Sequence, residues 1–527
     1  MKRKSIAILV ATSLIASTFV GCGSSSTTET QTSTATEEST AEESSDVEEV
    51  VEVEEDKEPA VISMLLSDQA TSGYTEDWGI LTWIEEYANV ILEVTAVPSS
   101  DYTAKRELIY NSGNIPDIVT ATTATTSEVG SGILLPISQY EDSMPNYTAY
   151  VDENGYRDVI DATRFSDGNY YSLPTKIRSE TIQSKQWMVR TDIFEENNLE
   201  IPTTMDELLE VGMELKEIYP SSTPITNRFG ANNFVNGIAS AYGTIAGVAL
   251  GDGMLYVEET DEWIFAPITD EWYEMLSYMN QLIETGVLDQ EFTTLESTDY
   301  ESKIIQGTTF IIFDWCVNIS KYNAAGAELD EDYNVAMIYP PEGSDGNYSI
   351  LSRNPWDQNW VFPATLADDE EHLAEVLAYV DWGYTKEAED IFAFGMEGET
   401  YYIDDDGTYT FLDDSVDYTQ LGINSNCLSI TGHIDTLIGD LSAEDVAVIL
   451  STSDIVPASN PQSPLTTDQI EETSIYSTVL TDYVTSMMEK FIFGEEDLAN
   501  WDTFVSECIT KGSDDLTEEY NSAWSGN

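Results

Sequence analysis

Short apolar runs alternate with helical patterns in the first part of the folded chain. The runs at 61–66, 91–97 and 118–121 predict strands. The segments between them predict helices over 80–87 and 100–111, the second of which ends at Gly113. This alternation indicates a parallel α/β sheet. Because ligands bind beyond the carboxyl ends of such strands, the loops after Leu66 and Ala121 are candidate binding loops.

Later segments predict amphipathic helices. Thr204 and Glu207 have the spacing of a capping box, and the helix that they begin ends before Pro220. Apolar stripes mark further helices around Trp272, around Val376 and over 467–491. We expect Trp272 to pack in a core, because it belongs to such a stripe.

The amino terminus has the pattern of a secretory signal. Lys2, Arg3 and Lys4 precede an apolar run over 6–20 that is too short to span a membrane. The following segment, 23–58, holds 13 acidic residues and one lysine among Ser, Thr and Ala. Such a composition cannot form a core, so we expect a solvated tether.

The end of the apolar run, Phe19–Cys22, resembles the lipobox of bacterial lipoproteins, with Phe19 where that family usually has Leu. The resemblance implies that Cys22 carries a lipid and becomes the new amino terminus. The alternative is an ordinary signal peptide that is cleaved nearby. With a lipidated Cys22, the tether would hold the folded chain at the outer face of the cell membrane.

Composition limits the possible partners. The 527 residues carry 98 acidic and 20 basic side chains, for a formal net charge of -78. Phosphate binding needs clustered Lys and Arg, so nucleic acid is excluded as a partner. A chain of this length exceeds one hydrophobic core, so we expect two lobes. The cysteines after Cys22 and the two histidines have no spacing typical of metal sites or disulfides, and we predict no cofactor.

Several motifs, in this order, resemble the extracellular solute-binding proteins, family 1, of carbohydrate ABC transporters. The likeness is greatest to their large lipoprotein branch, which includes alginate-oligosaccharide binders. The motifs are SGNIPDI at 112–118, GNYYSLP at 168–174, MVRTDIF at 188–194, NLEIPTT at 198–204, TGVLDQEF at 285–292, FIFGEEDLANWD at 491–502 and EYNSAW at 519–524.

The resemblance implies a fold class and a domain plan. The fold is α/β, a two-lobe periplasmic-binding-protein-like fold of type II, in which each lobe is a sheet flanked by helices and a hinge joins the lobes. The expected plan is a signal peptide with lipobox at 1–22, the tether at 23–58, a first lobe at 59–175 and 357–456, and a second lobe at 176–356 and 457–527. The chain would cross near 174–176, 344–356 and 456–464.

The alginate-binding relatives carry a calcium loop after the helix that follows the NLEIPTT motif. Here residues 220–224, PSSTP, offer neither carboxylate nor amide ligands, so we predict no calcium and no other metal. The DDDG run at 404–407 has its glycine too early for an EF-hand and predicts a hairpin turn.

Sugar sites combine aromatic rings with polar hydrogen-bonding groups. By position, Trp315 lies where the maltose-binding proteins have a sugar-stacking tryptophan, with core packing as the alternative. The complete set of predicted binding residues is Asp68, Tyr74, Asp77, Trp78, Thr123, Thr125, Arg190, Asn233, Tyr242, Trp315, Trp356, Asp357 and Trp360.

Four of the few basic residues lie beside the first predicted crossover. They are Lys176, Arg178, Lys185 and Arg190. An anionic sugar is one interpretation of this group, and neutralisation of nearby carboxylates is the other; Arg190 in particular is a candidate structural partner of Asp192.

The leading functional hypothesis is a non-catalytic, monomeric receptor that delivers an oligosaccharide to the membrane subunits of an ABC permease. It would contact the membrane only through its lipid anchor. A surface glycosidase with paired carboxylates is the alternative from another class. A third hypothesis is a peptide-binding or sensory lipoprotein on the same fold, and fold alone cannot separate these functions.

Overall fold

The computed structural model describes residues 58–69, 73–179, 182–246, 252–404, 407–413, 416–425, 427–439 and 441–526. The predicted signal segment, Cys22 and the tether up to residue 57 lie outside these ranges. Within them, no helix combines the length and the apolar character that a membrane span requires.

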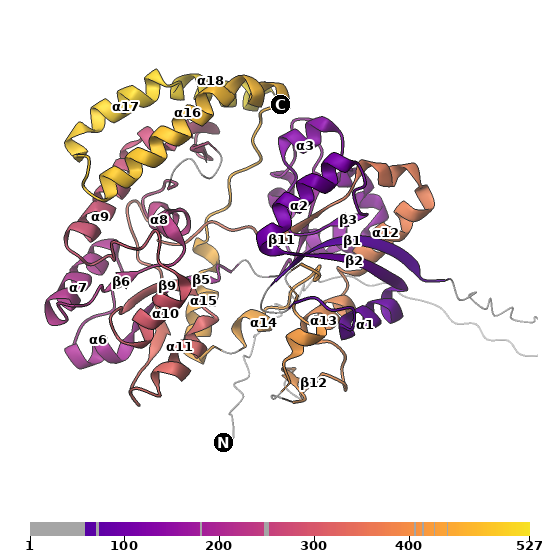
Figure 1. The fold of residues 1–527 in the computed structure, drawn as a ribbon, viewed down its shortest axis with the longest axis horizontal. Coiled ribbons are helices and arrows are strands. Elements are labelled where there is room, and N and C mark those ends of the chain that lie inside the picture. Colours follow the sequence, from indigo (N-terminus) through magenta and orange to yellow (C-terminus); the bar gives the residue numbers. More distant parts are fainter. Residues whose placement is uncertain are drawn as a thin grey trace, which may run out of the picture. The chain divides into compact units, whose positions relative to one another are not determined.

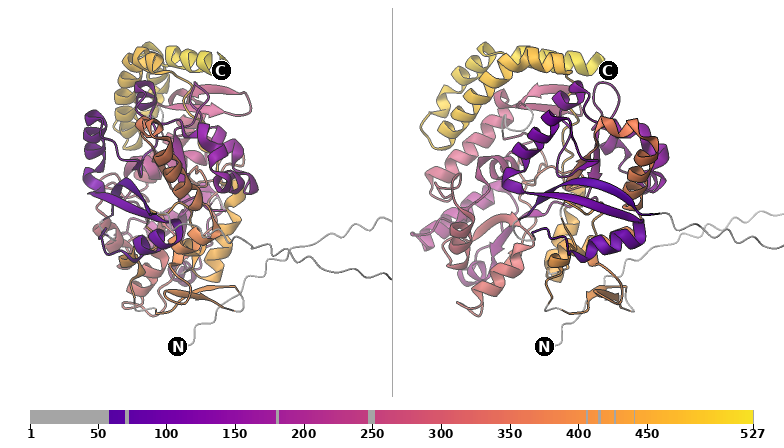
Figure 2. Two further views of the ribbon diagram at one scale, coloured as in Figure 1. Left: turned by 90° about the vertical axis from the view of Figure 1, so that its right-hand side faces the viewer. Right: turned by 45° about the vertical axis from the view of Figure 1, so that its right-hand side comes forward.

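The first sheet confirms the strands predicted near the start of the folded chain. Its order is β2-β1-β3-β11-β4, with β1, β2 and β3 parallel and β11 antiparallel to both of its neighbours. The strands are β1 (Ala60–Asp68), β2 (Val90–Pro98), β3 (Ile118–Val119), β4 (Ser172–Thr175) and β11 (Gln358–Val361). The neighbours β1 and β2 run side by side in Figure 2. The interior strand β1 is apolar and almost continuously buried, whereas buried and exposed positions alternate along the edge strand β2.

Helices cover the first sheet with apolar faces. They are α1 (Gly79–Ala88), α2 (Ser99–Ser112), α3 (Thr126–Ser131), α4 (Pro145–Glu153), α5 (Arg157–Asp161), α12 (Glu370–Trp382) and α13 (Lys386–Phe394). Val376 of the predicted 373–380 stripe is fully buried against the sheet residues Ile62 and Met64. The apolar spacing therefore identified this helix and its buried face correctly.

The second sheet has the order β10-β5-β9-β6, in which β5 is antiparallel to β10 and β9, and β6 is parallel to β9. Its strands are β5 (Lys185–Arg190), β6 (Ile225–Thr226), β9 (Ile311–Trp315) and β10 (Val335–Met337). Its helices are α6 (Thr191–Asn197), α7 (Met205–Ile218), α8 (Gly230–Ser240), α9 (Asp270–Glu284), α10 (Ser297–Ile305), α11 (Asn318–Gly326), α14 (Asp435–Ile438), α15 (Ala443–Ser451), α16 (Thr467–Ile492), α17 (Trp501–Thr510) and α18 (Ser513–Gly526).

Two predictions about these helices are confirmed. Thr204 and Glu207 form the capping box that begins α7. Trp272 of α9 is fully buried, and its ring stacks on Phe504 with the centroids 5.6 Å apart. Helix α16 lies along α9 (Figure 1), so the closing segment of the chain completes the core of the second lobe.

One part of the predicted domain plan does not agree with the packing. Helices α14 and α15 fall in the 357–456 segment expected in the first lobe, but Ile438 and Ile449 pack against Met188 and Ile312 of the second sheet. Asp445 also accepts a hydrogen bond of 2.6 Å from the Met337 backbone N–H. Helical periodicity shows which face of a helix is buried but not which sheet buries it, so the sequence pattern could not place these helices.

The remaining elements are peripheral. The strands β12 (Tyr401–Ile403) and β13 (Tyr409–Phe411) form the hairpin predicted around 404–407, although Asp405 and Asp406 themselves lie outside the described residues. A second hairpin joins β7 (Met254–Val257) and β8 (Glu262–Phe265). The 3-10 helices are η1 (Ile137–Ser143), η2 (Ala266–Ile268), η3 (Ala364–Asp368), η4 (Tyr418–Leu421), η5 (Ser453–Ile455) and η6 (Leu498–Asn500).

Candidate functional site

Two arginines share one carboxylate where the chain passes between the sheets. Arg178 Nη1 donates to Asp357 Oδ2 at 2.8 Å, and Arg353 Nη2 donates to Asp357 Oδ1. Arg353 Nη1 also donates to Ser184 Oγ at 3.2 Å. Burial alone would raise the pKa of Asp357, but Arg178, Arg353 and Lys176 outweigh it and hold this pKa below its ordinary value. Asp357 is therefore an ionised link between the first crossover and the returning segment.

A third segment of the chain, which contains Asn424 and Gly432, packs against Lys176 beside this link. Lys176 has a left-handed backbone, with φ of 51°, and its side chain is buried. Its Nζ donates to the Asn424 carbonyl at 3.3 Å, and burial, with a smaller contribution from Arg178, lowers its pKa to about 8. At Gly432 an added Cβ would lie 3.2 Å from Lys176 Cγ, so glycine allows the close approach of the two segments.

On the second-lobe side, Trp315 presents a partly open ring. It ends β9, opposite Lys185 in the antiparallel register, and 38% of its surface is exposed. Lys185 Nζ lies 4.2 Å from the centroid of the Trp315 ring, and the Phe229 ring meets the indole edge-on, with centroids 6.4 Å apart. Trp315 is therefore not a core residue, and a cation lies over its ring.

A buried carboxylate fixes the neighbourhood of Trp315. Asp314 is fully buried and accepts hydrogen bonds from Arg228 Nη2 at 2.7 Å, Asn318 Nδ2 at 3.0 Å and the Trp315 backbone N–H at 2.8 Å. The Tyr322 hydroxyl donates to it as well. Asp314 is thus fully occupied, and it holds the Arg228 side chain and the Trp315 backbone in place. We call Lys176, Arg178, Lys185, Arg228, Asp314, Trp315, Arg353 and Asp357 the crossover cluster.

The predicted loop residues of the first lobe are mostly engaged in local structure. Asp68 accepts from the Tyr74 backbone N–H at 2.8 Å, and Asp77 is exposed in the same loop. Thr125 is the N-cap of α3 and forms a capping box with Glu128. Thr123 is exposed and accepts a hydrogen bond from Asn359 Nδ2 at 3.0 Å, which leaves this pair accessible to a ligand.

Three predicted tryptophan platforms are core residues instead. Trp78 is 3% exposed, Trp356 is 8% exposed and Trp360 is 0% exposed, which leaves no open ring face for a sugar. The Trp360 indole N–H donates to the Cys427 carbonyl at 3.1 Å, so its polar atom is satisfied inside the first lobe. Their places in the chain, Trp78 in the loop after β1 and Trp356 and Trp360 near the returning crossover, did not show that they are buried.

The other predicted second-lobe residues lie outside the crossover cluster. Arg190 Nε donates to Asp192 Oδ1 at 2.8 Å from the opposite end of β5, which is the structural partnership considered above as the alternative. Asn233 is exposed on α8, and Tyr242 packs on Tyr278 with ring centroids 5.9 Å apart. The structure therefore brings together Trp315, Asp357 and the basic residues 176, 178 and 185, but not Arg190.

Sequence reasoning missed Arg353, Arg228 and Asp314. Arg353 lies within the predicted 344–356 crossover, and the scarcity of basic residues could have identified it. Arg228 and Asp314 had no comparable signal, because their pairing joins residues far apart in the chain. Among the described residues, no group of three or more His, Cys, Asp or Glu side chains is placed to hold a metal ion.

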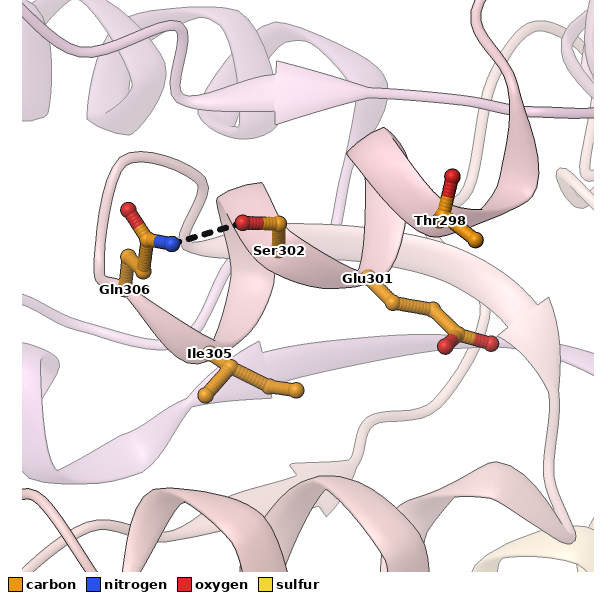
Figure 3. Close-up of a pocket in the computed structure, with 5 residues that line it drawn as sticks. All are labelled: Thr298, Glu301, Ser302, Ile305 and Gln306. Atoms are coloured by element: carbon orange, nitrogen blue, oxygen red, sulfur yellow. Dashed lines mark hydrogen bonds between the residues drawn. The ribbon is translucent and has the colours of Figure 1, made fainter.

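A small surface depression on α10 is a poor alternative site. Its lining is Thr298, Glu301, Ser302, Ile305 and Gln306, all from one helix and its end (Figure 3). Gln306 Nε2 donates to Ser302 Oγ at 2.7 Å, so two of its polar groups already bind each other. A depression with a single helix as its wall cannot enclose a ligand.

Comparison with known proteins gives a consistent result. Residues 83–402 match the family described as "Bacterial extracellular solute-binding protein". The polygalacturonan/rhamnogalacturonan-binding protein YtcQ of Bacillus subtilis is 23% identical over 457 residues, which is 84% of this chain and 87% of that protein. The lipoprotein LipO of the same organism is 22% identical over 488 residues, or 88% and 91% of the two chains.

Solved structures show the same fold. The alginate-binding protein AlgQ2, solved without calcium ion, superposes with a TM-score of 0.67 at 17% identity, covering 89% of this chain and 99% of that one. The substrate-binding protein FusA of Streptococcus pneumoniae, in complex with kestose, gives 0.64 at 16% identity, covering 88% and 99%. The two-lobe α/β fold expected from the sequence is thereby confirmed, and YtcQ, AlgQ2 and FusA are binding proteins rather than enzymes.

Proposed function

The chain belongs to the bacterial extracellular solute-binding proteins, and we propose that it captures an oligosaccharide outside the cell and delivers it to an ABC importer. One observation carries the proposal. At the place where the chain passes between two lobes, the partly exposed Trp315 ring stands beside charged hydrogen-bonding groups of the crossover cluster. An aromatic face bordered by polar groups suits a sugar ring, which has apolar faces and a rim of hydroxyls.

The proposed mechanism is closure of the two lobes on the ligand. The hinge would comprise the described residues 176–179 and 182–184 of the first crossover together with the segments 338–357 and 431–434, which lie between the two sheets. The link Arg178–Asp357–Arg353 joins the first two of these segments, and the bridge between Ile177 and Thr431 joins the first to the third. The protein would act as a monomer and present its closed form to the permease subunits.

We further propose that a lipid on Cys22 anchors the protein and that the tether at 23–58 lets it move above the membrane. The apolar run and the lipobox-like residues support this, as does the similarity to a lipoprotein. Cys22→Ala should move the protein from the membrane fraction to the medium, whereas the matched control Ser24→Ala should leave it on the membrane. Equal membrane retention of both variants would exclude the lipid anchor.

A thermal-shift screen with a broad panel of neutral and acidic oligosaccharides tests the binding function. A ligand at about 100 times its Kd adds roughly 2.7 kcal/mol to the free energy of unfolding, which raises the melting temperature measurably. Names of relatives mention galacturonans and fructans, so both classes belong in the panel. A panel in which no saccharide changes the melting temperature would count against the proposal.

A further inference from the structure

Most basic side chains that the structure describes have a carboxylate partner, and Lys185 has none among the described residues. The sequence holds 98 acidic and 20 basic residues, so a cation meets carboxylates readily. Exposed Lys321, for example, binds Glu301 at 2.6 Å. Lys185 is half-buried, yet it forms no ion pair with any residue that the structure describes.

The two carboxylates whose charges act on Lys185, Asp314 and Asp357, are paired with arginines. Asp357 accepts from Arg178 and Arg353, and Asp314 accepts from Arg228. The crossover cluster thus contains five cationic side chains and two carboxylates, in two hydrogen-bonded groups around Asp357 and Asp314 whose charges act on Lys185. Glu301 and Lys321, which adjoin Arg228, add one charge of each sign. The cluster is a positive region inside a strongly negative protein.

The position of Lys185 couples this charge to an aromatic face. Its Nζ lies 4.2 Å from the Trp315 ring centroid and 5.3 Å from the Phe229 ring centroid. Burial lowers the pKa of Lys185, with a further contribution from Arg353, so an anion placed beside it would offset a real desolvation cost. A sugar ring against Trp315 would bring its substituents within reach of this ammonium.

We infer that Lys185 and Trp315 form a subsite for a saccharide that carries an anionic group. The ring takes the apolar face of the sugar, and the Lys185 ammonium binds a uronate carboxylate or a sulfate ester. Arg353 and Arg178 keep the local potential positive without occupying the subsite, because Asp357 holds both. This inference rests on the proposed function, since it specifies the sugar class that the same site would take.

The test compares matched ligands and matched variants by calorimetry. The probes are galacturonate trisaccharide, its methyl ester of the same length, a sulfated disaccharide with its desulfated form, and a neutral fructan trisaccharide. The variants are Lys185→Met, Lys185→Gln, Lys185→Arg and the control Lys490→Met, which removes the same charge from an exposed position on α16. Melting temperatures of all variants show whether the fold is retained.

The wild type should bind an acidic probe more tightly than its neutral counterpart. Lys185→Met and Lys185→Gln should lower the affinity for the acidic probe roughly 10- to 100-fold, the range of a hydrogen bond between charged groups. Lys185→Arg should recover most of that loss, and Lys490→Met should change little. Preference for the carboxylate or for the sulfate probe identifies the anion.

Three results would overturn the inference. If only neutral probes bind, or if the Lys185 variants keep the full preference for the acidic probe, the subsite is wrong while the sugar-binding function stands. If no saccharide of any charge binds, the proposed function fails together with the inference.

Discussion

Trp360 and Trp315 lie on opposite sides of the crossover and differ in burial. Trp360 of β11 is fully buried, its N–H is satisfied by the Cys427 carbonyl, and its ring stacks on Tyr379 with centroids 6.3 Å apart. Trp315 of β9 keeps 38% of its surface exposed beside Lys185. Two tryptophans in strands thus serve different purposes, because the first lobe encloses one ring and the second lobe leaves the other partly open.

The difference shows what distinguishes a binding residue from a core residue here. Trp360 follows the polar residues Gln358 and Asn359 in β11, whereas Trp315 follows three apolar residues and Asp314 in β9. Neither local pattern shows that the first ring is buried and the second partly open. What separates them is long-range packing: Cys427, Leu428 and Ile430 belong to the core that covers Trp360, whereas Trp315 has Lys185 over its ring and Phe229 in a T-shaped contact. A ring left open in this way can exchange water for a ligand.

The largest expected effect is on the free energy of unfolding, at the buried Trp360 of the first lobe. Trp360→Ala should reduce the free energy of unfolding by about 3–5 kcal/mol, because it opens a cavity in the first-lobe core and leaves the Cys427 carbonyl without its donor. Urea denaturation followed by circular dichroism measures this. A loss below about 1 kcal/mol would mean that the ring is not enclosed.

A smaller effect is expected at the carboxylate that links the two sides. Asp357→Asn should cost about 1–3 kcal/mol of unfolding free energy near neutral pH, since two largely buried guanidinium groups lose their counter-charge. The folded-state pKa of Asp357 is lowered, so its contribution is full above the ordinary carboxyl pKa of about 4 and is lost as pH falls below that value.

Denaturation of wild type and Asp357→Asn at several pH values tests whether the stabilising contribution of Asp357 falls as the pH falls. The difference in unfolding free energy between the two proteins should shrink as pH falls from 6 to about 3. A difference that grows with acidity would contradict the assigned ion pairs.

Trp315→Ala should affect binding more than folding. Removal of an aromatic platform should cost about 1–3 kcal/mol of binding free energy, or roughly 5- to 150-fold in Kd. The unfolding free energy should change by about 1 kcal/mol or less, because the ring is partly exposed. Calorimetry with a saccharide that binds the wild type, together with urea denaturation of the same variant, decides whether Trp315 binds ligand or packs in the core. Full affinity combined with a large loss of stability would return Trp315 to the core.

The sequence predicted much of the fold because the spacing of hydrophobic residues indicates whether a segment forms a helix or a strand and which of its faces is buried. The buried strand at 61–66, the capping box at Thr204 and the core position of Trp272 all follow from patterns within one element. Helices α14 and α15 were assigned to the wrong lobe, because their packing partner lies about a hundred residues away in the chain. Local pattern carries no information on such contacts.

Some residues of the candidate site were indicated by the sequence, and others were shown only by the structure. Trp315 became a candidate through its position relative to the maltose-binding proteins, and Asp357 and Lys185 through their places near the predicted crossovers. The pairing of Asp314 with Arg228 and of Asp357 with Arg353 needed the three-dimensional structure, since so many carboxylates make any single pair uninformative in sequence. The burial of Trp78, Trp356 and Trp360 could not be predicted from the sequence either, because segments far away in the chain cover these rings.

Hydroxyl-radical footprinting with mass spectrometry tests the central claim most directly, which is that the crossover cluster is the ligand site. The protein is labelled with and without a mixture of uronate and neutral oligosaccharides, and oxidation of Trp315 is compared with that of Tyr402, which is 44% exposed on the β12–β13 hairpin. We predict that the saccharides protect Trp315 and leave Tyr402 unchanged. Protection of other residues, with Trp315 oxidised as before, would contradict the account.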